Sequence, residues 1–304
     1  MSTLPTVHIP SDASRLPMTL PRLAEKKALG EPIVMVTAYD YPSALAVDTA
    51  GVDLVLVGDS GAMTVLGYDS TVPVELDELL MLAKAVRRGL KTPFLVGDLP
   101  FGSYEVSDEQ AVQTAFRFVK EAGCDAVKLE GGGPASCARA RAIIGAGIPV
   151  MGHVGLTPQT ATALGGYRAQ GRTAAAATRV AADALALQEA GCFSIVFEAI
   201  PAGVTDVIME HMEIPVIGIG AGPATDGQVL VLHDLLGIHP DFKPKFAKRF
   251  ADVHGEMLRG VEAYAEAVRT RAFPGPEHTY GIAPEEIDRL KDRLRADKER
   301  STAT

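Results

Sequence analysis

The sequence has few of the features that mark secreted, membrane-spanning or zinc-binding proteins. Its 304 residues include only three cysteines. Their wide spacing forms neither a disulfide framework nor a zinc-binding pattern. No apolar run reaches the roughly 18 residues of a membrane-spanning helix, and the N-terminal segment lacks the apolar core of a signal peptide. We therefore predict a soluble cytoplasmic protein that does not associate with a membrane.

Positive charge is also scarce. The chain has 29 Lys and Arg against 38 Asp and Glu, which gives a net charge of −9. This balance argues against a broad face that binds nucleic acid or an anionic membrane, although a small positive site for an acidic substrate is still compatible with it. Hydrophobic residues make up 47% of the chain, enough for one large core. We expect small-molecule substrates and no nucleic-acid partner.

What the sequence does contain is a repeated alternation of short apolar runs and helical patterns. The runs are continuous in Val, Ile and Leu, which is typical of strands covered on both faces. The seven clear runs are residues 32–39, 53–59, 93–100, 125–131, 149–155, 194–199 and 215–222. Helical patterns lie between most of them, for example at 75–89, 107–123 and 173–191, and each of these three ends in glycine, as helices often do.

This alternation predicts an α/β fold with a parallel sheet. Seven strands, with a weaker eighth near residues 245–250, predict a (β/α)8 TIM barrel. A doubly wound open sheet is the alternative, but no GxGxxG motif follows the first strand. We expect a flexible N-terminal arm at 1–17, the barrel as a single domain at 18–282, and a charged C-terminal helical extension at 283–304, which can pack on the barrel or on a neighbouring subunit.

Four of the predicted strands end in a carboxylate: Asp59, Asp98, Glu130 and Glu198. In a barrel, the carboxyl ends of all strands open onto one face, so these side chains would converge. A single acidic residue at a strand end is more often a helix cap. Four like charges in one pocket, however, repel one another unless a cation or a proton joins them. Because all the ligands are oxygens, we predict Mg²⁺ or Mn²⁺ rather than zinc.

Such a metal can bind the carboxylate and keto oxygens of a 2-oxo acid and stabilise the enolate formed when the adjacent carbon loses a proton. Glu198 follows an apolar run, which suits a general base near neutral pH, unless it caps the helix expected near Pro201. Lys128 lies two residues before Glu130 and faces the same side of its strand. It can hold the substrate or simply pair with Glu130.

Other polar residues near strand ends have two interpretations each. His153 can hydrogen-bond the substrate, although a lone histidine is more often structural. Ser60, beside Asp59, can donate to a substrate carboxylate or cap a helix. The glycine-rich loop at 165–172 carries two arginines and fits either a mobile lid or an exposed loop.

Several long motifs follow one another in collinear order between residues 20 and 280. They include TAYDYPSA (37–44), LVGDSGAMTVLGYDST (56–71), DLPFGSY (98–104), KLEGG (128–132), GHVGLTPQ (152–159), GGYRAQGR (165–172) and IPVIGIGAGPATDGQVLVLHDLLGI (214–238). In this combination they resemble the ketopantoate hydroxymethyltransferase family of phosphoenolpyruvate mutase-like barrels. Motifs of this length and number are far more specific than a short pattern.

The resemblance implies a transfer of a hydroxymethyl group from 5,10-methylenetetrahydrofolate, as co-substrate, to 3-methyl-2-oxobutanoate, which gives 2-dehydropantoate. It implies one Mg²⁺ per subunit and a homo-oligomer, commonly a decamer. The implied metal ligands are Asp59, Asp98 and Glu130. The implied substrate contacts are Ser60, Asp98 and Lys128, with His153 in a matching motif beside them. Glu198 matches the base that removes the proton.

Two other functions fit parts of the pattern. A sister lyase or aldolase on the same barrel would use the same metal-stabilised enolate but would act with an aldehyde. A barrel without catalytic activity would bind a ligand or a partner protein and is expected to have lost a ligand or the base. The five positions Asp59, Asp98, Lys128, Glu130 and Glu198 are all intact, which favours the enzyme.

Overall fold

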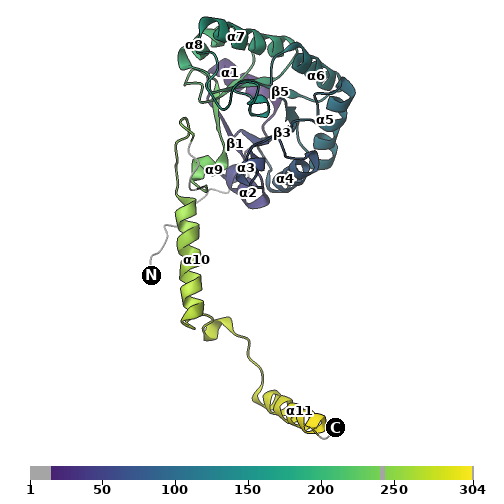
Figure 1. Cartoon of the computed structure of the whole chain (residues 1–304), viewed down its shortest axis with the longest axis vertical. Helices are drawn as coiled ribbons and strands as arrows, with labels where there is room; N and C mark the ends of the chain where they lie inside the picture. The colour runs from purple at the N-terminus through teal and green to yellow at the C-terminus, as the bar shows by residue number, and fades with distance from the viewer. Residues whose placement is uncertain (1–14, 240–243, 303–304) are drawn as a thin grey trace. The chain divides into compact units, whose positions relative to one another are not determined.

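The structure is a computed structural model that describes residues 15–239 and 244–302 (Figure 1). Eight parallel strands form a closed barrel in the order β1 to β8. The strands are β1 (Ile33–Thr37), β2 (Leu54–Val57), β3 (Phe94–Asp98), β4 (Ala126–Lys128), β5 (Val150–Gly155), β6 (Ser194–Glu198), β7 (Val216–Ile219) and β8 (Gly227–Leu230). Because β1 pairs with β8, the sheet has no open edge. The predicted (β/α)8 barrel is confirmed, and the open doubly wound sheet is excluded.

The eighth strand lies earlier in the chain than the sequence predicted. The prediction of a strand near residues 245–250 is wrong, because that segment forms a turn and irregular backbone. The true β8 follows β7 after the short, helix-free segment 220–226. Its side chains alternate between buried and exposed, unlike the continuously buried strand β7. A short alternating strand carries a weaker apolar signal, which explains the error.

Helices surround the strands, and Figure 1 shows α4 to α8 along the outside of the barrel. The helices of the barrel are α1 (Leu20–Leu29), α2 (Tyr41–Ala50), α3 (Gly61–Thr64), α4 (Leu76–Gly89), α5 (Asp108–Ala122), α6 (Pro134–Gly145), α7 (Ala174–Glu189), α8 (Ala202–Met209) and α9 (Leu232–Leu236), with a 3-10 turn η1 (Pro158–Thr160). The helical patterns predicted at 75–89, 107–123 and 173–191 are confirmed as α4, α5 and α7. Gly123 ends α5 in the left-handed conformation, at φ 70°.

Apolar side chains occupy two regions of the barrel. The larger cluster lies between the strands and the helices and includes Leu95 and Phe118. A second cluster fills the barrel interior and includes Ile33 and Leu54, at the amino ends of their strands, together with Leu23 of α1. This apolar layer fills the interior from the amino ends of the strands. It leaves the carboxyl ends for the polar residues described below.

The chain divides into two compact units, of which the first ends at Ala251 and the second begins at Asp252. In this division, residues 252–282 belong with the C-terminal helices. The second unit contains α10 (Val253–Arg269), a 3-10 turn η2 (Pro276–His278) and α11 (Pro284–Thr302). The predicted N-terminal arm lies almost wholly outside the described residues. Across the described parts of the chain, no helix combines the length and apolar character needed to cross a membrane.

Candidate active site

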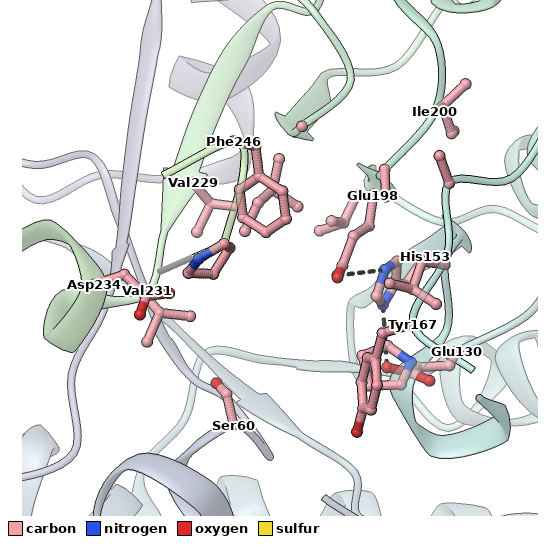
Figure 2. A pocket seen from close by; sticks show the side chains of 18 of the residues that line it. Ser60, Glu130, His153, Tyr167, Glu198, Ile200, Val229, Val231, Asp234 and Phe246 are labelled. Carbon is pink, nitrogen blue, oxygen red and sulfur yellow. Dashed lines mark ion pairs between the residues drawn. The ribbon is translucent and has the colours of Figure 1, made fainter. Parts of the chain in front are cut away.

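A pocket of about 860 Å³ is formed by residues at the carboxyl ends of the strands. It is within the range of roughly 300–1,000 Å³ that is typical of small-molecule sites. All seven residues singled out in the sequence line it: Asp59, Ser60, Asp98, Lys128, Glu130, His153 and Glu198. Figure 2 shows four of them around the cavity. Residues far apart in the sequence therefore meet at one end of the barrel.

Strand pairing sets the first contact in this pocket. Asp98 is the last residue of β3 and lies in register with Lys128, the last residue of β4. The preceding Gly97 faces outward, where an added Cβ would lie 2.4 Å from the ring of Phe118. Because side chains alternate along a strand, Asp98 faces the interior. Its Oδ1 accepts a hydrogen bond from the Nζ of Lys128 at 2.7 Å.

His153 lies between two of the carboxylates. Its Nδ1 is 3.2 Å from the Oε1 of Glu130, and its Nε2 is 3.2 Å from the Oε2 of Glu198, as the dashed lines in Figure 2 mark. Burial opposes a charge on the ring, but the contacts with the two glutamates outweigh it and raise the pKa of His153 to about 9. The imidazole is therefore a cation at neutral pH and holds Glu198 at the edge of the pocket.

Gln159 is a polar residue of the site that the sequence interpretation missed. Its Nε2 donates to the Oδ2 of Asp59 at 3.1 Å and to the carbonyl of Leu99 at 2.9 Å. Its backbone N–H donates to the Oε2 of Glu130 at 3.1 Å, and its Oε1 accepts from the hydroxyl of Tyr104 at 2.7 Å. Gln159 thus orients two carboxylates at once. Its place in the long GHVGLTPQ motif was the available signal.

The acidic residues form a buried excess of negative charge. Burial and then the nearby Glu130 raise the pKa of Asp59. Burial raises the pKa of Asp98 to about 6, even though Lys128 acts in the opposite direction. Among the described residues, five carboxylates line this pocket, the four strand-end residues and Asp234, together with Lys128, Lys245, Arg168 and His153. A further cation would relieve the repulsion among the carboxylates.

The donor set fits a magnesium ion that keeps part of its water shell. Within the described ranges, no three His, Cys, Asp or Glu side chains are arranged to hold a metal directly. Mg²⁺, however, is usually held by one or two carboxylates, with water and substrate completing its octahedron. The Oε1 of Glu130 is buried and has ion-pair contacts only, at 3.2 Å from the Nδ1 of His153 and 3.8 Å from the Nζ of Lys128. Asp59, Asp98 and Glu130 are the carboxylates that could hold such an ion through one or two direct contacts, with water completing its shell.

The glycine-rich loop at 165–172 also contributes to the pocket. Tyr167 and Arg168 line its mouth, whereas Arg172 is not among the lining residues. The N–H of Gln170 donates to the carbonyl of Ala199 at 2.9 Å, next to Glu198. The loop is thereby tied to the end of strand β6, beside the candidate base.

Comparison with known proteins places this chain in a family. The family model for ketopantoate hydroxymethyltransferase matches residues 17–276. The chain is 53% identical to the mitochondrial 3-methyl-2-oxobutanoate hydroxymethyltransferase 1 of Oryza sativa subsp. japonica, over 91% of this chain and 78% of the rice protein. It is also 53% identical to the 3-methyl-2-oxobutanoate hydroxymethyltransferase of Moorella thermoacetica, over 88% of this chain and 99% of that protein.

Solved structures agree on the fold. A phosphonopyruvate hydrolase complexed with oxalate and Mg²⁺ superimposes with a TM-score of 0.58, over 93% of this chain and 99% of that one. A 2,3-dimethylmalate lyase of the PEP mutase/isocitrate lyase superfamily gives 0.55, over 95% and 100%. At 12% and 16% identity, these likenesses concern the barrel alone. The family match and the relatives at 53% identity, in contrast, cover nearly the whole described barrel, and the chain belongs to the ketopantoate hydroxymethyltransferase family.

Proposed function

We propose that this protein transfers a hydroxymethyl group from 5,10-methylenetetrahydrofolate to 3-methyl-2-oxobutanoate and so forms 2-dehydropantoate, a step of pantothenate biosynthesis. The observation that carries the proposal is the convergence of buried carboxylates with Lys128 at the carboxyl end of the barrel, in a chain of this family. We place one Mg²⁺ per subunit at Asp59, Asp98 and Glu130. When bound there, the ion would polarise the keto group of the substrate and stabilise the enolate.

Lys128 and Ser60 are the groups that we assign to the substrate oxygens. Burial works against the charge on Lys128, but Asp98 and Glu130 outweigh it and raise its pKa, so the ammonium stays charged. Its hydrogen bond to Asp98 leaves further N–H groups for an anionic oxygen. The Oγ of Ser60 lies 2.8 Å from the hydroxyl of Tyr39, which can donate to it. Ser60 is then able to donate its own proton to the substrate carboxylate.

Glu198 is the proposed base. Its side chain is 16% exposed and reaches the pocket from the end of β6, whereas Glu130 is 2% exposed. It takes the proton from C3 of the oxo acid, the carbon beside the keto group, while the cationic ring of His153 holds it in place. The C3 carbon then bonds to the one-carbon unit. In the overall balance, one water supplies the hydroxyl oxygen and tetrahydrofolate is released.

Deuterium exchange tests this assignment without the folate. In D2O with Mg²⁺, the wild-type protein should exchange the C3 proton of 3-methyl-2-oxobutanoate. Glu198→Gln should slow that exchange by about 10²–10⁴-fold, because an amide cannot accept the proton. Magnesium binding measured by calorimetry should be unchanged. Retained exchange in the variant would show that Glu198 is not the base. In a separate assay of the wild type, turnover with a free aldehyde but not with the folate would favour an aldolase.

We also propose that the protein works as a homo-oligomer, a decamer, in the cytoplasm. Large apolar side chains of α10, among them Met257, Val261 and Tyr264, are more than half exposed in the single chain. Burial of such residues against other copies would account for them. Light scattering of the purified protein measures its mass directly, and a monomer at micromolar concentration would contradict the proposal.

A further inference from the structure

One carboxylate that lines the pocket takes no part in the network around Lys128. Asp234 lies in α9 and is only 5% exposed. Its Oδ1 is buried and has no hydrogen-bond partner in the described part of the chain. Figure 2 shows Asp234 across the pocket from Glu130 and His153. Since buried polar atoms are nearly always paired, the unpaired Oδ1 of a carboxylate that lines a pocket indicates a ligand.

The surroundings of Asp234 suit a flat ring. Val229, Val231 and Phe246 also line the pocket, and in the view of Figure 2 they lie, like Asp234, away from Glu130 and His153. Val229 is 5% exposed, whereas Phe246 is 37% exposed. An aromatic face and branched aliphatic side chains offer dispersion contacts to a planar heterocycle. A five-carbon oxo acid would use little of this region.

The charge of Asp234 fits a ligand edge that donates hydrogen bonds. Burial raises its pKa to about 6, while Arg249 and His239 pull in the other direction. The group is therefore mostly ionised at neutral pH. An ionised carboxylate accepts two parallel hydrogen bonds, and it cannot donate any.

We infer that Asp234 binds the pteridine ring of the one-carbon co-substrate through the 2-amino group and the adjacent ring N–H, which together form a two-donor edge. The inference rests on the proposed function, and it assigns the folate co-substrate of that reaction to the side of the pocket where Asp234 lies. The donor edge is remote from the ring nitrogen that carries the one-carbon unit. An anchor across the pocket from Glu198 therefore directs that unit towards the enolate.

Calorimetry with tetrahydrofolate, in the presence of Mg²⁺ and the oxo acid, tests the inference. Asp234→Asn should weaken binding by about tenfold to a hundredfold, because a charged acceptor is replaced by an amide. The matched control is Asp206→Asn, which removes the same charge from the exposed face of α8. The control should bind tetrahydrofolate as the wild type does. Equal binding by Asp234→Asn and the wild type would overturn the inference.

A ligand analogue gives an answer that does not depend on the folding of any variant. A tetrahydrofolate whose 2-amino group is replaced by methyl should bind the wild type at least about tenfold more weakly, and Asp234→Asn should discriminate much less between the two ligands. Equal affinity of the wild type for both ligands would overturn the inference. If the wild type exchanges the C3 proton yet binds neither ligand, the folate part of the proposed function fails as well.

Stability provides an independent readout. If Asp234 were kept only for structure, its replacement would destabilise the protein. If it is kept for a ligand, removal of a charge that burial disfavours should leave the thermal midpoint of the ligand-free protein unchanged or higher. The increase in midpoint on adding tetrahydrofolate should shrink in the same variant. A lower midpoint in Asp234→Asn, together with an undiminished ligand-induced increase, would show a structural role and contradict the inference.

Discussion

Two clusters of charged side chains in this barrel contain similar residues but differ in how their carboxylates ionise. On the outer surface, Glu121 of α5 accepts hydrogen bonds from Arg117 at 2.6 Å and from Lys84 at 3.0 Å. These contacts lower the pKa of Glu121 to about 2. In the pocket, Asp98 contacts Lys128 at 2.7 Å, yet burial raises its pKa to about 6.

The difference shows that contact with a cation does not by itself decide the state of a carboxylate. Water solvates the surface cluster, so the partners of Glu121 determine its pKa, and the pairs contribute little to stability. In the pocket, the loss of hydration outweighs the neighbouring lysine. A buried, electrostatically unfavourable cluster of this kind is typical of a site kept for its function rather than for stability.

The largest expected effect comes from removal of the buried lysine. Lys128→Met should destabilise the protein by about 3–5 kcal/mol, because it leaves buried carboxylates without their main cation. Arg117→Met, on the surface, should lower stability far less, because water already solvates that cluster. Urea denaturation of both variants measures the contrast. Similar losses would mean that burial does not separate the two clusters.

Metal binding should stabilise only the buried cluster. Addition of Mg²⁺ at about 100 times its dissociation constant should increase the stability of the wild type by about 2.7 kcal/mol. Asp98→Ala should weaken magnesium binding in calorimetry and reduce this gain, while Asp77→Ala on the surface should preserve it. An unchanged metal titration in Asp98→Ala would show that Asp98 is not a metal ligand. As a control, EDTA should return the wild type and both variants to their metal-free stability.

A smaller effect is expected for the amide that orients the pocket. Gln159→Leu should cost about 1–3 kcal/mol, since Asp59 and the hydroxyl of Tyr104 lose buried hydrogen-bond partners. Deuterium exchange at C3 should slow as well, because Asp59 is no longer held in place. Wild-type stability and exchange rate in this variant would show that Gln159 does not position the site.

The smallest expected effect is the pH dependence of the stability that the surface residue Glu121 provides. The folded pKa of Glu121, about 2, lies below its ordinary value of 4.5. The contribution of Glu121 to the free energy of unfolding is therefore complete above pH 4.5, and it is lost as the pH falls through about 2. The difference in thermal midpoint between the wild type and Glu121→Gln should be small at neutral pH and vanish at low pH. High salt should shrink it further, and a difference that grows on acidification would contradict the assignment.

Individual residues show how far the sequence could predict the site. Lys128 was expected to face the same side of its strand as Glu130, with substrate binding and pairing both open. In the structure, its Nζ lies 2.7 Å from Asp98 but 3.8 Å from Glu130. The nearer partner lies on the neighbouring strand. Which residue becomes this partner depends on the register between β3 and β4, and the spacing of residues within one strand does not specify that register.

The sequence by itself determined the strand–helix alternation, seven of the eight strands and the polar residues at their carboxyl ends, because periodicity and strand-end position are local properties. Only the tertiary structure decided the position of β8, the hydrogen bonds of Gln159 and the lack of a hydrogen-bond partner at the Oδ1 of Asp234. Each of these depends on which distant segments pack together once the barrel closes. Burial then sets the energy of every charge in the pocket, and burial is a property of the folded chain.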